Sequence, residues 1–365
     1  MKSKAISYKH LPSISILVIC YNSEEYIEEA LLSILAQDYE GKMECIIVDD
    51  ASTDKTADKI RNFINVHGDS MDFTFIPLSK NVGQAKAMDY AMKHAKNEWF
   101  MNADSDDIQL PDRCRSSMEI LSRYPCAKIL AVGARHMTST GKLLDSYQPP
   151  FYCSYESAPD ELYLEKAEAR VQNWLNASPI KIIGFQQIMH RSIYDLWGDL
   201  LNNESNISRF TQDVTWFMRA FLSGPVLATK HAMLFYRQHS ANCENRVFEG
   251  RQAALMKEKY NDTLMKFRGG AYISKLDSLN RALLTPNLTD CSPQDIRKMI
   301  ESCQLSLNFY TMFADWWSCS IWQRLRRLID NRGKVRPLHY HMGILRLLPL
   351  KVFIWLKDIR NKLRH

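Results

Sequence analysis

The chain has 365 residues, of which 46% are hydrophobic and 24% charged, and this composition excludes disordered and fibrous proteins. At about 100–200 residues per domain, the length predicts two domains or one large domain with an extension. The net charge of +6 is uneven, because residues 321–365 hold 12 Lys/Arg and 2 Asp/Glu while the rest of the chain is slightly acidic. A typical nucleic-acid-binding protein distributes its charge differently, so we expect no nucleic-acid partner.

The cysteines and apolar runs predict a cytoplasmic protein. Nine cysteines are scattered without a Cys-x-x-Cys pair, which is typical of reduced thiols and shows no zinc motif. The apolar run at residues 14–20 is too short to cross a bilayer, and no cleavage site of a signal peptide follows it. No other stretch reaches the roughly 20 apolar residues of a membrane span.

The first third of the chain alternates apolar runs with amphipathic segments. Strands are predicted at ISILVIC (14–20), MECIIVDD (43–50), FTFIPLS (73–79) and EWFMNADSDD (98–107). Helices are predicted after them, at residues 22–37, 52–64, 83–95 and 111–124. Asn22 and Glu25 have the spacing of a capping box for the first of these helices. This alternation predicts an α/β fold with a doubly wound, mostly parallel sheet and helices on both faces.

The pattern changes in the remainder of the chain. Residues 149–169 are predicted to form an irregular connection, because prolines, aromatics and acids interrupt any periodicity. An apolar segment at 182–189 and a helix at 213–221 follow. After residue 247 only helices are predicted, at residues 248–267, 293–313 and from 321 onward.

Three polar groups lie at or just past the carboxyl ends of predicted strands, where parallel sheets bind their ligands. They are Tyr21–Asn22, Asp49–Asp50 and Asp104–Asp107. The three carboxylates of the last group repel one another unless a cation or solvent relieves them. They suit Mg²⁺ or Mn²⁺, which takes its other oxygens from water and a diphosphate. A solvated turn before the next helix is an open alternative, as is a plain helix N-cap for the Asp49–Asp50 pair.

Other nucleotide-binding and hydrolase motifs are missing from the sequence. There is no GxxxxGK[ST] string of a P-loop, no GxGxxG after the first strand and no GxSxG elbow. A phosphoacceptor receiver domain would need an aspartate at the end of its middle strand, and residues 73–79 have none. These classes are therefore excluded.

Three consecutive strings together resemble a known family. They are SISILVICYNSEEYIEEALLSILAQ, CIIVDDASTDKTADKI and NVGQAKAMDYAMKHAKNEWFMNADSDD with Pro111 after it. From about residue 14 to residue 121 they resemble the nucleotide-sugar-binding half of a family-2 glycosyltransferase. The later strings PIKIIGFQQIMHRSIYDLWG, TQDVTWFMRA and LFYRQHSAN resemble the family's acceptor-side strand, base-bearing helix and closing segment. The match is patchier there.

The resemblance implies a GT-A type fold in two halves, and the helical pattern after residue 247 adds a third part. Residues 1–125 would form the nucleotide-sugar-binding half and residues 126–246 the acceptor-binding half. Residues 247–365 would form a helical C-terminal extension. We expect an inverting, metal-dependent hexosyl- or N-acetylhexosaminyl-transferase of surface polysaccharide or glycolipid synthesis.

The resemblance also assigns residues to the donor, a nucleotide-diphosphate sugar and in particular a UDP-sugar. Tyr21 would pack on the uracil or ribose, Asp50 would bind the base edge and Asp104 would face the ribose. Asn22 and Lys86 are further candidate donor-binding residues. All five positions lie at the end of a predicted strand, directly after one, or in the first turn of the helix that follows.

The metal and the base come from the same resemblance. Asp106 would hold Mg²⁺ or Mn²⁺ against the donor diphosphate, and His239 is a second candidate ligand. Asp213 would be the general base that takes the proton of the acceptor hydroxyl. Gln212 departs from the family, which usually has Glu before this aspartate. One base opposite the leaving group implies a single displacement with inversion, because no second carboxylate is identified as a nucleophile.

The C-terminal end carries a predicted amphipathic helix. Its basic residues flank one apolar stripe, which consists of Leu345, Leu348, Val352, Leu356, Ile359 and Leu363. Residues 343–365 therefore predict an interfacial helix on an anionic membrane, on the inner face of the cytoplasmic membrane. A helix docked on the body of the protein is the alternative. A lipid-linked saccharide acceptor would make membrane contact useful. An upstream aromatic cluster is predicted to be core, with a partner surface or a lipid-facing patch as alternatives: Phe309, Tyr310, Phe313, Trp316, Trp317 and Trp322.

Two other functions compete with this interpretation. An inactive nucleotide-sugar-binding scaffold of the same fold would explain Gln212, but the aspartates argue against it. A sugar nucleotidyltransferase would need a glycine-rich, basic loop after the first strand, where this chain has the acidic CYNSEEY.

Overall fold

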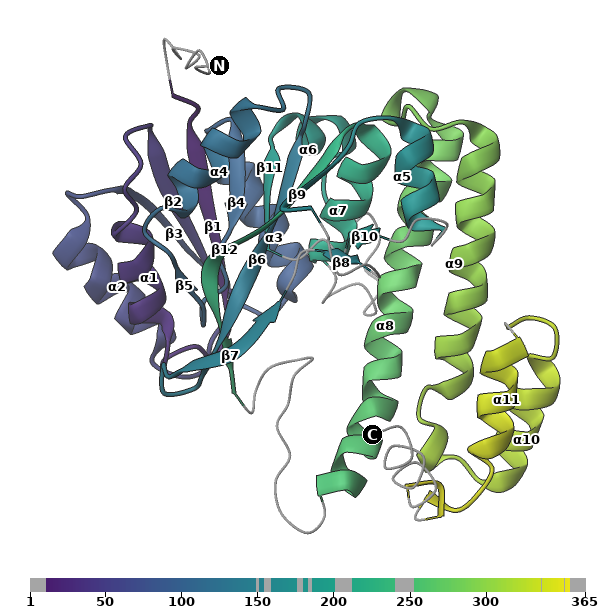
Figure 1. Ribbon diagram of the computed structural model, residues 1–365. Coiled ribbons are helices and arrows are strands. Elements are labelled where there is room, and N and C mark those ends of the chain that lie inside the picture. The colour runs from purple at the N-terminus through teal and green to yellow at the C-terminus, as the bar shows by residue number, and fades with distance from the viewer. Residues whose placement is uncertain are drawn as a thin grey trace.

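The computed structural model describes residues 11–148, 151–153, 159–175, 180–182, 186–200, 212–239, 253–335, 337–350 and 352–354. A twisted sheet with helices on both faces forms one side of the molecule. Long helices run down its other side and end in a smaller helical cluster (Figure 1).

The sheet is mixed but mostly parallel. Its strand order is β3-β2-β1-β4-β11-β6-β12-β5, with β7 paired to β6 and β9 to β12. The first four of these strands run parallel, β11 is antiparallel to both of its neighbours, and β12 is parallel to β6. The predicted doubly wound sheet is therefore confirmed. The strand bounds are β1 Ile14–Cys20, β2 Met43–Asp49, β3 Asp72–Pro77, β4 Trp99–Asn102, β5 Ile108–Gln109, β6 Ile129–Thr138, β7 Leu143–Gln148, β9 Glu161–Leu164, β11 Gln187–His190 and β12 Val226–Gln238.

Alternate residues of the central strands enter two separate cores. Ile16 and Val18 of β1 face α1 (Ile27–Leu35), α2 (Thr56–His67) and α4 (Arg113–Ser122). Leu17 faces the opposite core, with α3 (Gln84–His94), α6 (Ser192–Trp197) and α7 (Gln212–Ser223). Both faces are apolar because helices cover both, as the continuous apolar runs predict. Burying each of these side chains contributes about 1.5–3 kcal/mol.

The C-terminal helices extend the core on the α7 side. Leu279 of α8 (Ala253–Leu284) and Met299 of α9 (Pro293–Phe313) pack into it. Arg170 of α5 (Ala167–Trp174) is fully buried and joins the layers, because it donates to Phe221 O and pairs with Asp290. These contacts attach the helical region to the sheet.

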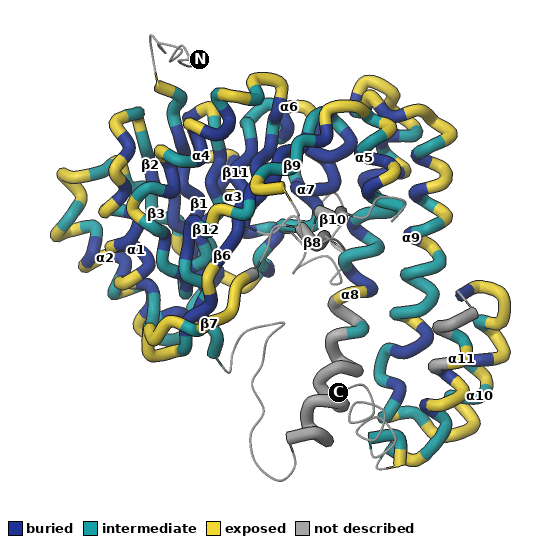
Figure 2. Tube along the Cα trace, in the orientation of Figure 1, coloured by how far each residue is buried: buried dark blue, intermediate teal, exposed yellow. Residues whose placement is uncertain are grey.

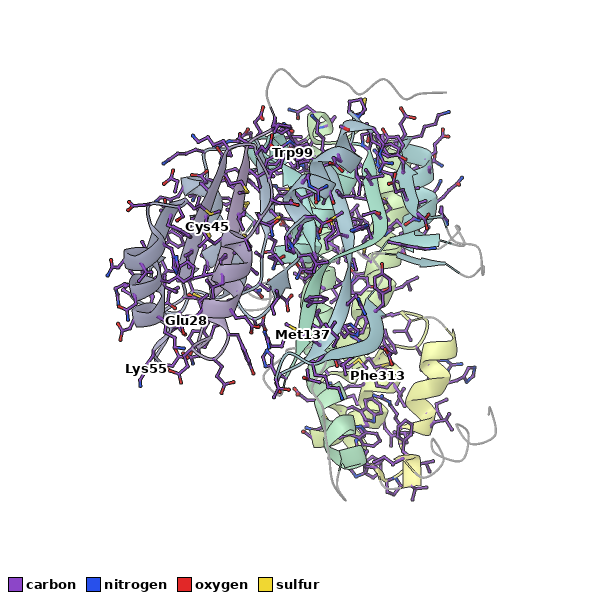
Figure 3. All side chains as sticks on the ribbon, turned by 60° about the vertical axis from the view of Figure 1, so that its left-hand side comes forward. Glu28, Cys45, Lys55, Trp99, Met137 and Phe313 are labelled. Carbon is purple, nitrogen blue, oxygen red and sulfur yellow. The ribbon has the colours of Figure 1, made fainter. Side chains whose placement is uncertain are left out.

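A third core lies among α9, α10 (Ile321–Asp330) and α11 (Pro337–Leu345). Figure 3 shows Phe313 among these helices, away from Cys45 in the sheet. Ser320 caps α10 in a capping box with Gln323. The buried members of this cluster are Met312, Phe313, Trp316, Leu328 and Val335.

Several predicted boundaries were wrong. Residues 149–169 contain β8 (Phe151–Cys153), β9 and the start of α5 as well as connecting chain, and β8 pairs with β10 (Ile180–Ile182). The fourth strand ends at Asn102, so the acidic residues lie in a loop. The helix predicted to end at residue 267 continues to Leu284, because packing against α9 overrides the weak helix propensity of two glycines.

The predicted capping box of the first helix is also wrong. That helix begins at Ile27, and its N-cap is Tyr26. Asn22 has a φ of +51°, which only some non-glycine residues adopt readily, and its side chain bonds to a neighbouring loop. Asn22 therefore shapes a loop of the site rather than the start of a helix.

Some predictions for the C-terminal region are confirmed and others are wrong. Trp316 and Phe313 are buried as predicted, but Trp322 is 77% exposed, so the core assignment was wrong for this residue. A continuous apolar stripe from Leu345 onward is also wrong, because α11 ends there and Pro349 interrupts the helix. The stripe residues Leu356, Ile359 and Leu363 lie outside the described residues.

Candidate active site

The loops after β1 and β2 are bonded to each other at the carboxyl edge of the sheet. The Asn22 backbone N–H donates to Ser52 Oγ at 2.9 Å, and Asn22 Oδ1 accepts from the Thr53 N–H at 2.8 Å. Tyr21, the next residue back, is 49% exposed. Its ring is therefore accessible for a planar ligand, while Asn22 is committed to loop structure.

Asp50 fixes the loop that leads into α3. Its carboxylate is buried and accepts from the Val82 N–H at 2.7 Å and from the Gly83 N–H at 2.8 Å. Gly83 has a φ of +85°, a conformation that a side chain would strain. Both carboxylate oxygens are therefore engaged by this loop. The contact of Asp50 with a base stays a prediction.

The acidic loop, residues 103–107, connects β4 to β5. Asp104 Oδ2 accepts from Gln186 Nε2 at 2.6 Å, and the same amide lies 3.3 Å from Asp107 Oδ2. Burial raises the pKa of Asp104, and the charge of Asp106 adds to it. Burial also raises the pKa of Asp107 well above its ordinary value. The repulsion inferred from the sequence is thus present in the folded loop.

Two buried arginines offset this negative charge. Arg113 of α4 is buried beside the loop, and its charge acts to lower the pKa values of Asp104 and Asp107. Arg237 donates its backbone N–H to Asp107 Oδ1 at 2.9 Å and its Nε–H to Asp106 O at 2.8 Å. Its guanidinium also reaches Glu29 Oε2 at 2.5 Å and lies 4.8 Å from the Tyr26 ring centre. Arg237 therefore holds the acidic loop against α1.

Asp106 and His239 meet at the end of β12. His239 Nε2 lies 2.9 Å from Asp106 Oδ2, and the Asp106 side chain is 27% exposed. The structure thus brings together the two predicted metal ligands, which are 133 residues apart in sequence. Like Asp104, and unlike the fully buried Asp107, this carboxylate can reach a ligand in solution.

Asp213 lies in the first turn of α7, as predicted. Its Oδ1 accepts from the Val214 N–H at 2.7 Å, and its backbone carbonyl accepts from Gln187 Nε2 at 3.0 Å. The positive end of the helix dipole favours a negative side chain at this position. The adjacent Gln186 bonds to the acidic loop. The start of β11 therefore contacts both the helix turn that carries the predicted base and the predicted donor-binding carboxylates.

Lys86 is engaged elsewhere. Its ammonium lies 3.8 Å from Asp199 Oδ2, and Lys93 lies 2.7 Å from the same oxygen. Both lysines are on α3. The observed partner of Lys86 is therefore a carboxylate, and its predicted contact with the donor would need that ion pair to open.

A divalent cation fits the Asp106–His239 pair. Two adjacent ligands of an octahedral ion lie about 3 Å apart when each bond is about 2.1 Å, which matches the observed separation. Among the described residues, no group of three or more His, Cys, Asp or Glu side chains is arranged to hold a metal ion. An ion here would therefore take its remaining ligands from a substrate and from water.

Sequence reasoning missed three residues of this site. Gln186 and Gln187 are two adjacent polar residues at the start of a short buried strand, which was the available signal. Arg237 belongs to the string LFYRQHSAN, but only His239 was singled out from it. None of the three is recognisable as a contact of the acidic loop or of α7 until β11 and β12 are placed in the sheet.

Comparison with known proteins identifies the fold and then the family. The structure of TarS from S. aureus, residues 1–349, aligns with a TM-score of 0.56 at 17% identity, over 96% of this chain and 88% of that one. The same protein in complex with UDP-GlcNAc aligns with a TM-score of 0.55, over 96% of this chain and 89% of that one. Together with the mixed sheet and its carboxyl-edge site, this likeness defines a GT-A type fold.

The family follows from the sequence. Residues 15–196 match glycosyl transferase family 2, and the chain belongs to this family. It is 37% identical over 107 residues to the poly-beta-1,6-N-acetyl-D-glucosamine synthase of Staphylococcus aureus, covering 29% of this chain and 25% of that protein. It is also 37% identical over 106 residues to an N-acetylglucosaminyltransferase of Mesorhizobium japonicum, covering 28% and 24% of the two chains. The match thus spans about a quarter of the length of these relatives.

Proposed function

We propose that this protein is an inverting, metal-dependent glycosyltransferase that moves a sugar from a nucleotide-diphosphate sugar to an acceptor hydroxyl. The observation that carries the proposal is the Asp106–His239 pair, which lies at the same sheet edge as Asp213. A UDP-sugar is the proposed donor, supported by the named N-acetylglucosamine enzymes among the relatives and by TarS bound to UDP-GlcNAc. The proposed acceptor is a saccharide or lipid-linked saccharide of surface polysaccharide or glycolipid synthesis.

The donor lies across the carboxyl edge of β1, β2 and β4 in this proposal. The exposed Tyr21 ring packs on the base or ribose, and Asp50 accepts from the base edge. Asp104 faces the ribose, and Gln186 holds its carboxylate in place at 2.6 Å. Asp106 and His239 would hold a divalent ion, Mg²⁺ or Mn²⁺. Such an ion supplies charge neutralisation to the diphosphate leaving group.

Asp213 acts on the acceptor. Its carboxylate takes the proton of the acceptor hydroxyl as the oxygen forms a bond to the anomeric carbon. The bond from that carbon to the diphosphate oxygen breaks, and the nucleoside diphosphate leaves with the electron pair. Attack on the face opposite the leaving group inverts the anomeric configuration. General base catalysis of this kind contributes roughly 10²–10⁴-fold to the rate.

Purified protein incubated with a panel of nucleotide sugars and Mn²⁺ tests the proposed function. We expect slow release of UDP from one UDP-sugar in the absence of acceptor, because water can replace the acceptor hydroxyl, and faster release when a saccharide acceptor is added. The competing inactive scaffold would bind a UDP-sugar in calorimetry without releasing UDP at any acceptor concentration. If the protein neither binds nor turns over any member of the panel, both the proposed transferase and the inactive scaffold are contradicted.

We also propose that the basic C-terminal region contacts an anionic membrane surface. In the part of the chain that the structure describes, no helix is both long and apolar enough to span a bilayer. α10 instead presents Trp322 and Ile329 to solvent at 77% and 69% exposure, on one side of the helix, beside the 86%-exposed Arg326. Figure 2 shows exposed positions along α10 and α11. An apolar stripe flanked by cations is typical of interfacial helices.

Co-sedimentation with anionic vesicles tests the membrane contact. Trp322→Glu with Ile329→Glu is expected to release the protein from vesicles at all salt concentrations, because these residues supply the apolar part of binding. Neutralising Arg326, Arg332 and Lys334 should weaken binding most at low salt, by about 1 kcal/mol for each charge.

Leu284→Glu on α8 is the matched control, because Leu284 is 82% exposed outside the proposed surface. It should leave vesicle binding unchanged. Truncation at residue 343 is less informative, because Gly343 packs against Leu328 and Arg346 is buried beside Phe313. If the unsubstituted protein does not sediment with anionic vesicles, or if the α10 variants sediment equally well, the membrane contact is refuted.

A further inference from the structure

Two adjacent glutamines at the start of β11 contact the two halves of the site. Gln186 Nε2 donates to Asp104 Oδ2 at 2.6 Å and lies 3.3 Å from Asp107 Oδ2. Gln187 Nε2 donates to the backbone carbonyl of Asp213 at 3.0 Å. The first amide therefore holds the acidic loop, and the second holds the first turn of the helix that carries the proposed base.

The topology of the sheet makes this bridge possible. β11 is antiparallel to β4, with Ile188 opposite Met101, so its first residues lie where β4 ends and the acidic loop begins. β11 is also antiparallel to β6, with Gln187 opposite Ala131. A strand inserted in this direction between two parallel strands brings its N-terminus, rather than its C-terminus, to the ligand-binding edge.

Gln186 is held in an unfavourable state. Its φ is +45°, which is uncommon for a residue with a side chain. It is 4% exposed, and its buried Oε1 has no hydrogen-bond partner in the part of the chain that the structure describes. Backbone strain and an unsatisfied buried oxygen both destabilise the fold, and such features concentrate at functional sites. In this conformation the Nε2 group faces the two carboxylates.

We propose that Gln186 and Gln187 are positioning residues that set the separation between the donor-binding carboxylates and the catalytic base. Gln186 orients Asp104 toward the donor and keeps the acidic loop in the conformation that exposes Asp106. Gln187 fixes the first turn of α7, and with it the carboxylate of Asp213. This inference rests on the proposed function, because it assigns the two amides to the two steps of that reaction, donor binding and proton removal.

Gln186 is expected to affect the affinity for the donor nucleotide, and Gln187 is expected to affect turnover. Methionine has a similar length and removes the amide, so Gln186→Met should raise the Kd of UDP in Mn²⁺ by roughly 10- to 100-fold, as for a lost hydrogen bond to a charged group. Gln187→Met should leave that Kd unchanged and lower turnover at saturating donor by about tenfold, because a displaced base transfers the proton less efficiently. Calorimetry with UDP and Mn²⁺ and UDP release at saturating donor measure the two effects.

Gln37→Met is the matched control. Gln37 is also buried, and its amide bonds to Leu110 O at 2.8 Å and to the Cys114 N–H at 3.0 Å, between α1 and α4. This variant should lower the melting temperature and leave UDP affinity and turnover unchanged. If Gln186→Met and Gln187→Met behave in the same way as Gln37→Met, the positioning role is refuted and both residues are merely structural.

Hydrogen exchange separates this inference from the proposed function. If the unsubstituted protein releases no UDP from any donor, the proposed function fails on that result alone. Gln187→Met should still accelerate exchange of the backbone amides at residues 216–219, the first that bond within the helix, if the amide holds α7, while Gln37→Met should not. Unchanged exchange at these amides would overturn the link between β11 and α7, whether or not the protein is an active transferase.

Discussion

Asp213→Asn is expected to lower turnover by roughly 10²–10⁴-fold while donor affinity stays close to that of the unsubstituted protein. Asparagine keeps Oδ1, which accepts from the Val214 N–H at 2.7 Å, so the first turn of α7 is preserved. It loses the ability to take a proton from an acceptor hydroxyl. Steady-state transfer rates at saturating UDP-sugar, with UDP affinity measured by calorimetry, show whether the defect lies in chemistry alone.

Asp58→Asn provides a matched control, because Asp58 also lies in the first turn of a helix but is exposed on α2. It should leave turnover unchanged. Gln212→Glu, which restores the residue usual in the family, should be tolerated. Near-normal turnover of Asp213→Asn would show that the base lies elsewhere. A large loss of UDP affinity in this variant would instead indicate that Asp213 supports the donor site.

The sheet could be predicted from the sequence because its signal is local. β1 and β2 are buried on both faces and therefore appear as continuous apolar runs, such as ISILVIC for β1. The helices between them have one apolar stripe each. β9 was missed because its four residues, ELYL, are too few to show a period, and its pairing partner Val226–Thr229 lies over 60 residues away. The length of α8 depends on packing against α9, which no local pattern reports.

The residues of the candidate site likewise differ in whether local sequence signals could place them. Tyr21, Asp50 and the acidic loop follow parallel strands directly, so topology alone places them at one edge. Gln186 reaches that edge through an antiparallel strand inserted between β4 and β6, and the sequence does not reveal this insertion. The ion pair of Lys86 with Asp199 was likewise invisible, because it joins α3 to the segment after α6.

Asp106→Ala is expected to abolish transfer and to weaken UDP binding in Mn²⁺, because Asp106 and His239 together hold the proposed ion. Removing the metal should reverse the effect of Asp106→Ala on UDP affinity. In EDTA the unsubstituted protein presents the Asp106 carboxylate to the diphosphate with no cation between them, so like charges repel. The alanine variant should then bind UDP at least as tightly as the unsubstituted protein. Calorimetric titrations of both proteins, with Mn²⁺ and with EDTA, give the four affinities of this cycle.

Asp69→Ala is the control, because Asp69 is an exposed aspartate in the turn after α2. It should match the unsubstituted protein in both conditions. If Asp106→Ala weakens UDP binding equally with and without Mn²⁺, Asp106 acts on the nucleotide or on the fold and not through a metal. Full transfer activity of the unsubstituted protein in excess EDTA would refute metal dependence itself. The Asp106–His239 contact would then be a hydrogen bond that ties the end of β12 to the acidic loop, as Arg237 does two residues earlier.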